Sequence, residues 1–187
     1  CDTGALKSLP HDFLVDGMGE VVKYGMIKSD ELFGILMNHD INTVHEVMDD
    51  IIARCVAIKR DVVEADEFDK GERMLLNFGH TLGHSIEQYY HYTGISHGRA
   101  VAKGMEIITD LAEKRGMCRK GLTADLCGCL KKYELTRDIG PTPAQLGSAC
   151  MNDKKRDGSS IHVIICSDIG KSSAVKMSVA DFNDFLA

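Results

Sequence analysis

The chain has 187 residues, of which 44% are hydrophobic and 6% aromatic, and it contains no tryptophan. This length suits a single domain, and a net charge of −6 argues against nucleic acid as a partner. No apolar run reaches the ~20 residues that span a bilayer, and no signal-peptide pattern opens the chain, so we expect no membrane segment. Seven scattered cysteines without a C-x-x-C pair fit free thiols in a reducing cytoplasm.

Apolar residues that recur every three and four positions predict helices along most of the chain. Ser29 is the expected N-cap of the second of them. In chain order, the predicted helices cover residues 16–27, 30–37, 43–65, 73–90, 97–115, 123–133 and 143–150.

The pattern changes near the C-terminus. Residues 161–166 are rich in β-branched side chains, residues 168–170 have turn composition, and residues 173–177 alternate like a partner strand. Ser178 is the expected cap of a last short helix. The predicted fold is therefore mainly α and multi-helical, with one small β-hairpin near the C-terminus.

The segment N-F-G-H-T-L-G-H at 77–84, followed by His97, is the most informative part of the chain. Side chains at i and i+4 of a helix share one face about 5–6 Å apart, so His80 and His84 can address one small volume. Because imidazole is the commonest metal ligand and titrates near neutrality, the pattern indicates a metal or proton-transfer site. Thr81 stands where a zinc-peptidase helix needs its general-base Glu, which argues against peptidase chemistry.

Glycines at 79 and 83 flank these histidines. Each costs a helix about 1 kcal/mol relative to Ala. We therefore expect a close neighbour at this point, either another helix or a ligand.

Five stretches in the same order resemble the C-terminal domain of the 3-dehydroquinate synthase family. They are G-M-G-E-V-V-K-Y-G at 17–25, K-R-D-V-V-E-A-D-E at 59–67, R-M-L-L-N-F-G-H-T-L-G-H at 73–84, S-H-G-R-A-V-A-K-G-M at 96–105 and D-K-K at 153–155. The resemblance implies that residues 1–187 form one helical metal- and substrate-binding domain. It also implies that the family's N-terminal NAD-binding α/β domain lies outside this chain, which alone should be inactive.

The resemblance assigns the metal ligands to Glu20, His80 and His97, with Zn²⁺ or Co²⁺ as the ion. One carboxylate and two imidazoles leave positions open for substrate oxygens, as catalytic zinc sites do. His84 matches a residue assigned to proton transfer. Asp69 stands where the family usually has Glu, one methylene longer, and matches a position with a proton-acceptor role.

The resemblance also implies a substrate site for a seven-carbon sugar acid phosphate. The matching positions are Lys23, Lys59, Arg73, Asn77 and Lys154, with Lys155 as an alternative to the last. A planar guanidinium and lysine point charges suit a carboxylate and a phosphate. Arg99 stands where Glu is common, and we expect this charge reversal to alter the surroundings of His97.

The implied activity is that of a cytoplasmic, homodimeric lyase of the shikimate pathway. It would convert 3-deoxy-D-arabino-heptulosonate 7-phosphate to 3-dehydroquinate and phosphate with a divalent metal and catalytic NAD. Three alternatives remain: another sugar-phosphate cyclase, a glycerol-dehydrogenase-like oxidoreductase, or a non-catalytic metal-binding helical module.

Overall fold

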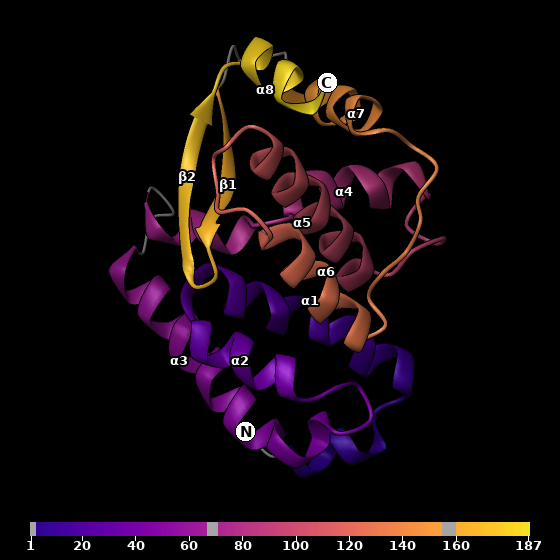
Figure 1. The fold of residues 1–187 in the computed structure, drawn as a ribbon. Coiled ribbons are helices and arrows are strands. Elements are labelled where there is room, and N and C mark those ends of the chain that lie inside the picture. The colour runs from indigo at the N-terminus through magenta and orange to yellow at the C-terminus, as the bar shows by residue number, and fades with distance from the viewer. Residues whose placement is uncertain (1–2, 67–70, 155–159) are drawn as a thin grey trace.

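A computed structural model describes residues 3–66, 71–154 and 160–187. These residues form a helical body with one antiparallel hairpin at its side (Figure 1). The 3₁₀ helices are η1 (Thr3–Ser8), η2 (Val44–Val47) and η3 (Glu72–Asn77). The α-helices and strands are α1 (His11–Lys28), α2 (Asp30–Asn38), α3 (Met48–Ala65), α4 (His80–Tyr89), α5 (His97–Lys114), α6 (Leu122–Lys132), α7 (Pro143–Lys154), β1 (Ile161–Asp168), β2 (Lys171–Met177) and α8 (Val179–Leu186).

Helix α5 is the centre of the body. It contacts α1, α4, α6 and β1, and most of its residues are buried, including small ones at 98, 100, 102 and 104. Helices α2 and α3 extend the body on the α1 side, while α7 and α8 pair at the opposite end (Figure 1). This arrangement places α5 against α1, which carries Glu20 and Lys23, and against α4, which carries His80 and His84.

Glycines allow α1 and α4 to approach α5 closely. A Cβ on Gly104 would lie 2.1 Å from the carbonyl oxygen of Gly79, and a Cβ on Gly98 would lie 1.9 Å from that of Asp16. Backbone therefore packs directly on backbone at both crossings. The close neighbour expected from glycines 79 and 83 is a helix, α5.

The hairpin docks on the C-terminal end of α1. Its strands pair from Ile161 opposite Met177 toward the turn. At the turn, the Gly170 amide donates to the Met26 carbonyl at 2.9 Å, and the Ser172 hydroxyl donates to that of Ile27 at 3.0 Å. The hairpin thus closes one end of the helical core.

The predicted fold class is confirmed, as are the hairpin and two helix caps. The Ser29 hydroxyl accepts from the Leu32 amide at 3.1 Å, and Ser178 forms a capping box with Asp181. Among the described residues, no helix combines the length and apolar character that crossing a bilayer requires.

The prediction of one continuous helix over residues 73–90 is wrong. The chain forms η3, turns at Gly79 with φ +78°, and only then begins α4 at His80. A Cβ at Gly79 would lie 2.5 Å from Met105 and 2.6 Å from the Val101 carbonyl. Packing against α5 therefore leaves room only for glycine at position 79, and glycine adopts the left-handed conformation of this turn without strain.

Two smaller boundaries also differ from prediction. Helix α1 begins at His11 rather than residue 16, directly after Pro10, whose fixed φ suits a helix start. Residues 44–47 form a 3₁₀ turn before α3 rather than its first α-helical turn.

Candidate functional site

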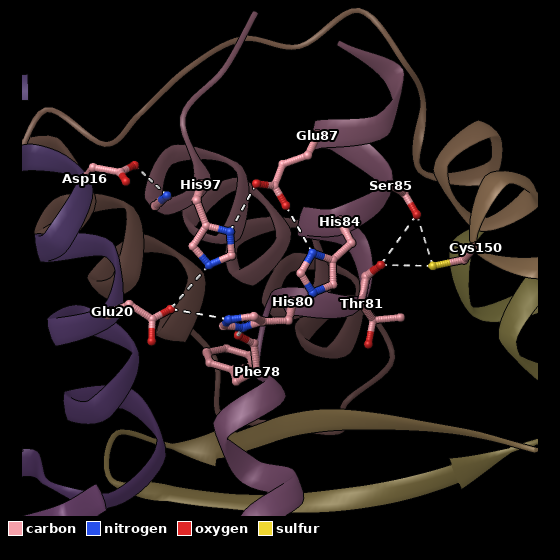
Figure 2. Close-up of polar contacts among 11 residues, drawn as sticks. Asp16, Glu20, Phe78, His80, Thr81, His84, Ser85, Glu87, His97 and Cys150 are labelled. Carbon is pink, nitrogen blue, oxygen red and sulfur yellow. Dashed lines mark hydrogen bonds and ion pairs between the residues drawn. The ribbon is translucent and has the colours of Figure 1, made fainter. Parts of the chain in front are cut away.

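Three side chains from three helices converge beside the α1–α5 crossing. Glu20 extends from α1, His80 is the first residue of α4, and His97 is the first residue of α5 (Figure 2). The Glu20 Oε1 atom lies 3.3 Å from His80 Nε2 and 3.9 Å from His97 Nε2. The fold therefore brings together residues that are up to 77 positions apart in the sequence, from 20 to 97.

Both imidazoles are oriented through their other nitrogen. His80 Nδ1 lies 3.2 Å from the Phe78 carbonyl oxygen, and His97 Nδ1 lies 3.1 Å from Glu87 Oε1. These partners only accept hydrogen bonds, so each Nδ1 carries the proton. Each Nε2 then presents a lone pair toward the Glu20 carboxylate.

Glu20 uses its two oxygens differently. Oε2 accepts from the Lys23 ammonium at 2.6 Å, whereas Oε1 is buried and accepts no hydrogen bond from the described residues. Burial raises the pKa of Glu20, but the Lys23 ammonium that donates to Oε2 favours the ionised form, and the pKa is lowered to about 2. Oε1 is therefore part of an ionised carboxylate.

A divalent cation fits this arrangement. The ligand atoms of Glu20, His80 and His97 all lie within 4.8 Å of one another, and all three are electron-pair donors. Bonds of 2.0–2.1 Å in a tetrahedral zinc site place ligand atoms about 3.3 Å apart. A cation would also satisfy the buried Oε1 atom and remove the repulsion between converging lone pairs.

His84 lies one turn beyond His80 on the same face of α4, as predicted. The two ring centroids are 5.7 Å apart. His84 is exposed, and its Nδ1 lies 3.0 Å from Glu87 Oε2, so its proton also sits on Nδ1. The structure thus keeps His84 outside the group formed with Glu20, which suits proton transfer better than ligation.

A cavity of about 320 Å³ opens beside this group. Lys59 on α3 and Arg73 on η3 are exposed at its wall, and Asn77 ends η3 at the same wall. Its lining consists of Glu20, Lys23, Tyr24, Lys59, Arg73, Leu76, Asn77 and His80. Burial lowers the pKa of Lys23 from its usual value, although the Glu20 carboxylate opposes that shift.

Two of the predicted residues cannot be placed in the same way. Asp69 lies outside the described residues. Lys154 is the last residue of α7, but its side chain is outside the described part of the structure, as is its alternative, Lys155.

Sequence reasoning missed two acidic side chains. Glu87 joins His84 to His97, and Asp16 accepts from the Gly98 amide at 2.6 Å, which fixes the start of α5. A glutamate three residues after a helical histidine was the available signal for Glu87. The Arg99 guanidinium contacts Asp12 and the Glu134 carbonyl rather than His97, so its effect on the surroundings of His97 stays a prediction.

Comparison with known proteins identifies similar sequences. A family model described as 3-dehydroquinate synthase C-terminal matches residues 17–156. The 3-dehydroquinate synthase of Clostridium perfringens (strain 13 / Type A) is 44% identical over 183 residues, which are 97% of this chain and 52% of that protein. The enzyme of the same name from Clostridium kluyveri is 41% identical over 187 residues, covering 99% and 52%. The chain thus spans about half the length of these curated relatives.

Solved structures share the fold at low sequence identity. The 2-epi-5-epi-valiolone synthase of Streptomyces hygroscopicus subsp. jinggangensis 5008, solved with NAD⁺ and Zn²⁺, superposes with a TM-score of 0.84 at 24% identity, covering 99% of this chain and 53% of that one. A 2-deoxy-scyllo-inosose synthase complexed with carbaglucose-6-phosphate, NAD⁺ and Co²⁺ gives a TM-score of 0.80 at 22% identity, covering 99% and 54%.

Proposed function

Because the chain belongs to the family of 3-dehydroquinate synthase C-terminal domains, we propose that it is the metal- and substrate-binding half of a 3-dehydroquinate synthase. The complete enzyme would convert 3-deoxy-D-arabino-heptulosonate 7-phosphate to 3-dehydroquinate and phosphate. The proposal includes an NAD-binding half outside these 187 residues and a homodimeric assembly. The described cysteines are all free, which supports a reducing cytoplasm.

One observation carries this proposal: three ligand atoms converge at the wall of a cavity lined with cations. Glu20 and His80 belong both to the ligand group and to the cavity lining. A bound molecule can therefore reach the metal position and the Lys59 and Arg73 side chains together. A phosphorylated sugar acid offers hydroxyls for the first and anionic groups for the second.

Glu20, His80 and His97 would hold the ion, Zn²⁺ or Co²⁺. When bound, the metal supplies a Lewis acid that lowers the pKa of a substrate hydroxyl, and NAD supplies the hydride acceptor. Holding the ligands on three packed helices fixes their relative positions before substrate arrives, which avoids reorganisation during the reaction.

The remaining residues would bind substrate and move protons. Arg73 can engage an anionic group through its planar fork, Lys59 can contribute a point charge, and the Asn77 amide can fix orientation. Lys23 and Lys154 are further proposed contacts. His84 would exchange a proton at Nε2, since its Nδ1–H is held by Glu87. Asp69 is the second proposed proton acceptor.

Calorimetric titration of the zinc-loaded chain with the sugar acid phosphate tests the substrate assignment. We expect binding that weakens with added salt and is reduced in Arg73→Met. Arg60→Met is the matched control, since Arg60 pairs with the adjacent Asp61. Absence of binding even after an NAD-binding half from a relative is supplied would refute the proposal.

An activity assay with the NAD-binding half supplied separates the alternatives. Release of inorganic phosphate after both halves are mixed indicates a sugar-phosphate cyclase, and product analysis identifies which carbocycle forms. A glycerol-dehydrogenase-like enzyme would reduce NAD without releasing phosphate. A non-catalytic module would bind zinc without affinity for the sugar acid phosphate.

A further inference from the structure

Glu87 divides its carboxylate between two histidines of the site. It lies on α4 one turn after His84, and only 13% of its side chain is exposed. Oε1 accepts from His97 Nδ1 at 3.1 Å, and Oε2 accepts from His84 Nδ1 at 3.0 Å (Figure 2). One side chain thus connects a ligand on α5 with the proton-transfer candidate on α4.

The two imidazoles that face Glu20 are held by different kinds of acceptor. His80 donates to a backbone carbonyl, that of Phe78, whereas His97 donates to the Glu87 carboxylate. A carboxylate partner fixes the ring orientation of a metal-binding histidine and makes its free nitrogen more basic. His97 therefore relies on Glu87 to present its Nε2 lone pair toward Glu20.

The same carboxylate also fixes the tautomer of His84. With its proton held on Nδ1, the exposed His84 ring has only Nε2 available to exchange a proton. The ring centroids of His84 and His97 lie 6.0 Å apart, close enough for the two oxygens of the Glu87 carboxylate to accept one hydrogen bond from each ring.

We propose that Glu87 is a positioning residue that sets the Nδ1–H tautomer of both His97 and His84, and so links metal affinity to proton transfer. The part that concerns His84 rests on the proposed function. The part that concerns His97 rests only on the ligand geometry of this chain.

A second metal position is the competing interpretation. Atoms of His84, Glu87 and His97 also lie within 4.8 Å of one another. An ion there would need His97 to give up its Nδ1 proton and to bridge two metals. Under our proposal that proton stays, so the chain binds one ion only.

Histidine tautomers in the metal-free chain give the first test. Long-range ¹H–¹⁵N correlation spectra at about pH 8 distinguish Nδ1–H from Nε2–H rings. We expect Nδ1–H rings for His97 and His84 in the wild type, and loss of the uniform Nδ1–H state in at least one of them in Glu87→Gln. An Nε2–H ring at His97 in the wild type overturns the proposal without reference to any variant.

Zinc affinity, measured by competition with a chromogenic chelator, gives the second test. Glu87→Gln retains the size of the side chain but its NH₂ group cannot accept, so one histidine loses its acceptor. We expect zinc binding to weaken about 10–100-fold, as for other partners of metal-bound histidines. Glu106→Gln is the matched control, because Glu106 is a half-buried glutamate that pairs with Lys103 on α5, and it should bind zinc as the wild type does.

Unchanged zinc affinity in a folded Glu87→Gln chain, or two zinc ions per wild-type chain, contradicts the proposal. The thermal unfolding of the metal-free variant shows whether it is folded; if it is not, the wild-type tautomers decide. These measurements use no sugar phosphate. Failure of the substrate titration with intact tautomers and zinc binding would therefore reject the proposed function alone.

Discussion

At the scale of single residues, each of the three proposed ligands has two polar side-chain atoms, and one of them is held by a hydrogen bond to another residue. The Lys23 ammonium occupies Glu20 Oε2, and the Phe78 carbonyl and Glu87 occupy the Nδ1 atoms of the two imidazoles. The three atoms that remain face one another. We therefore expect neighbouring histidines to differ in their importance for metal binding: His97 should be needed, whereas His84 should not.

Replacing His97 by Ala should remove zinc, whereas replacing His84 by Ala should not. His97 Nε2 faces Glu20 Oε1, while His84 belongs to no described group with Glu20. We expect zinc affinity to fall by at least about 100-fold in His97→Ala. This is the upper end of the loss seen when a residue that hydrogen-bonds to a metal-binding histidine is mutated. The metal content of the dialysed proteins measures this, and equal zinc in wild type and His97→Ala would refute the ligand assignment.

The sequence allowed the three converging side chains to be predicted but not the residues that orient them. Glu20, His80 and His97 lie within motifs that resemble a known family. Glu87 follows His84 by three residues, a spacing at which most glutamates are solvated surface residues. The role of Glu87 depends on His97, which comes within hydrogen-bonding distance only because α5 packs against α4.

At the scale of elements, the backbone contact between α4 and α5 sets the position of the histidines. His80 follows directly on Gly79, whose carbonyl oxygen faces Gly104 of α5. Periodicity predicted the long helices and the hairpin correctly. It could not predict the break at Gly79, because a glycine inside a helix and a left-handed glycine between two helices look alike in the sequence.

Gly104→Ala should destabilise the protein. Its Cβ would lie 2.1 Å from the Gly79 carbonyl oxygen, so the helices must separate, at a cost of about 1–3 kcal/mol for overpacking. Gly128→Ala is the control, because Gly128 lies in α6 with no atom near its Cβ position, and Ala should stabilise that helix by up to about 1 kcal/mol. Urea unfolding of both variants measures the difference, and stabilisation by both would contradict the close approach.

Arg119 connects the hairpin to α6 in a pH-dependent way. Its guanidinium donates to Asp168 at the end of β1 at 2.5 Å and also contacts Asp125. The hydrogen bond from Arg119 lowers the pKa of Asp168 below its ordinary 3.8. The resulting stabilisation is present above pH 3.8 and is lost as the pH falls through the folded-state value.

Arg119→Met should therefore be less stable than the wild type near pH 7, and the difference should shrink below pH 3.8. Denaturant unfolding across this range measures it. Arg60→Met should show no comparable dependence, since Arg60 pairs with its neighbour in sequence, Asp61, and that contact is also open to the unfolded chain. A pH-independent difference for Arg119→Met would reject the Asp168 contribution.

At the scale of the whole molecule, the site joins segments that are distant in the chain. Glu20, His80 and His97 belong to three helices around one continuous hydrophobic core. An ion held by them binds only the folded chain, because the unfolded chain does not bring the ligands together. Metal binding should consequently stabilise the entire domain rather than one helix.

Zinc should raise the melting temperature of the wild-type chain. A free concentration 100 times the dissociation constant contributes about 2.7 kcal/mol, which for a chain of this size corresponds to about 5–10 °C. His80→Ala should show no comparable rise, while His84→Ala should respond as the wild type does. Calorimetry with and without zinc measures these shifts, and an equal rise in His80→Ala would mean that zinc binds elsewhere.

His80 and His97 donate to different kinds of acceptor, and this difference affects how the site can change during evolution. The acceptor of His80 is a main-chain oxygen at Phe78, which no single codon change deletes. The acceptor of His97 is encoded by one codon, that of Glu87. If the proposed ligands hold a metal, mutation at position 87 can therefore change metal affinity while Glu20, His80 and His97 all stay in place.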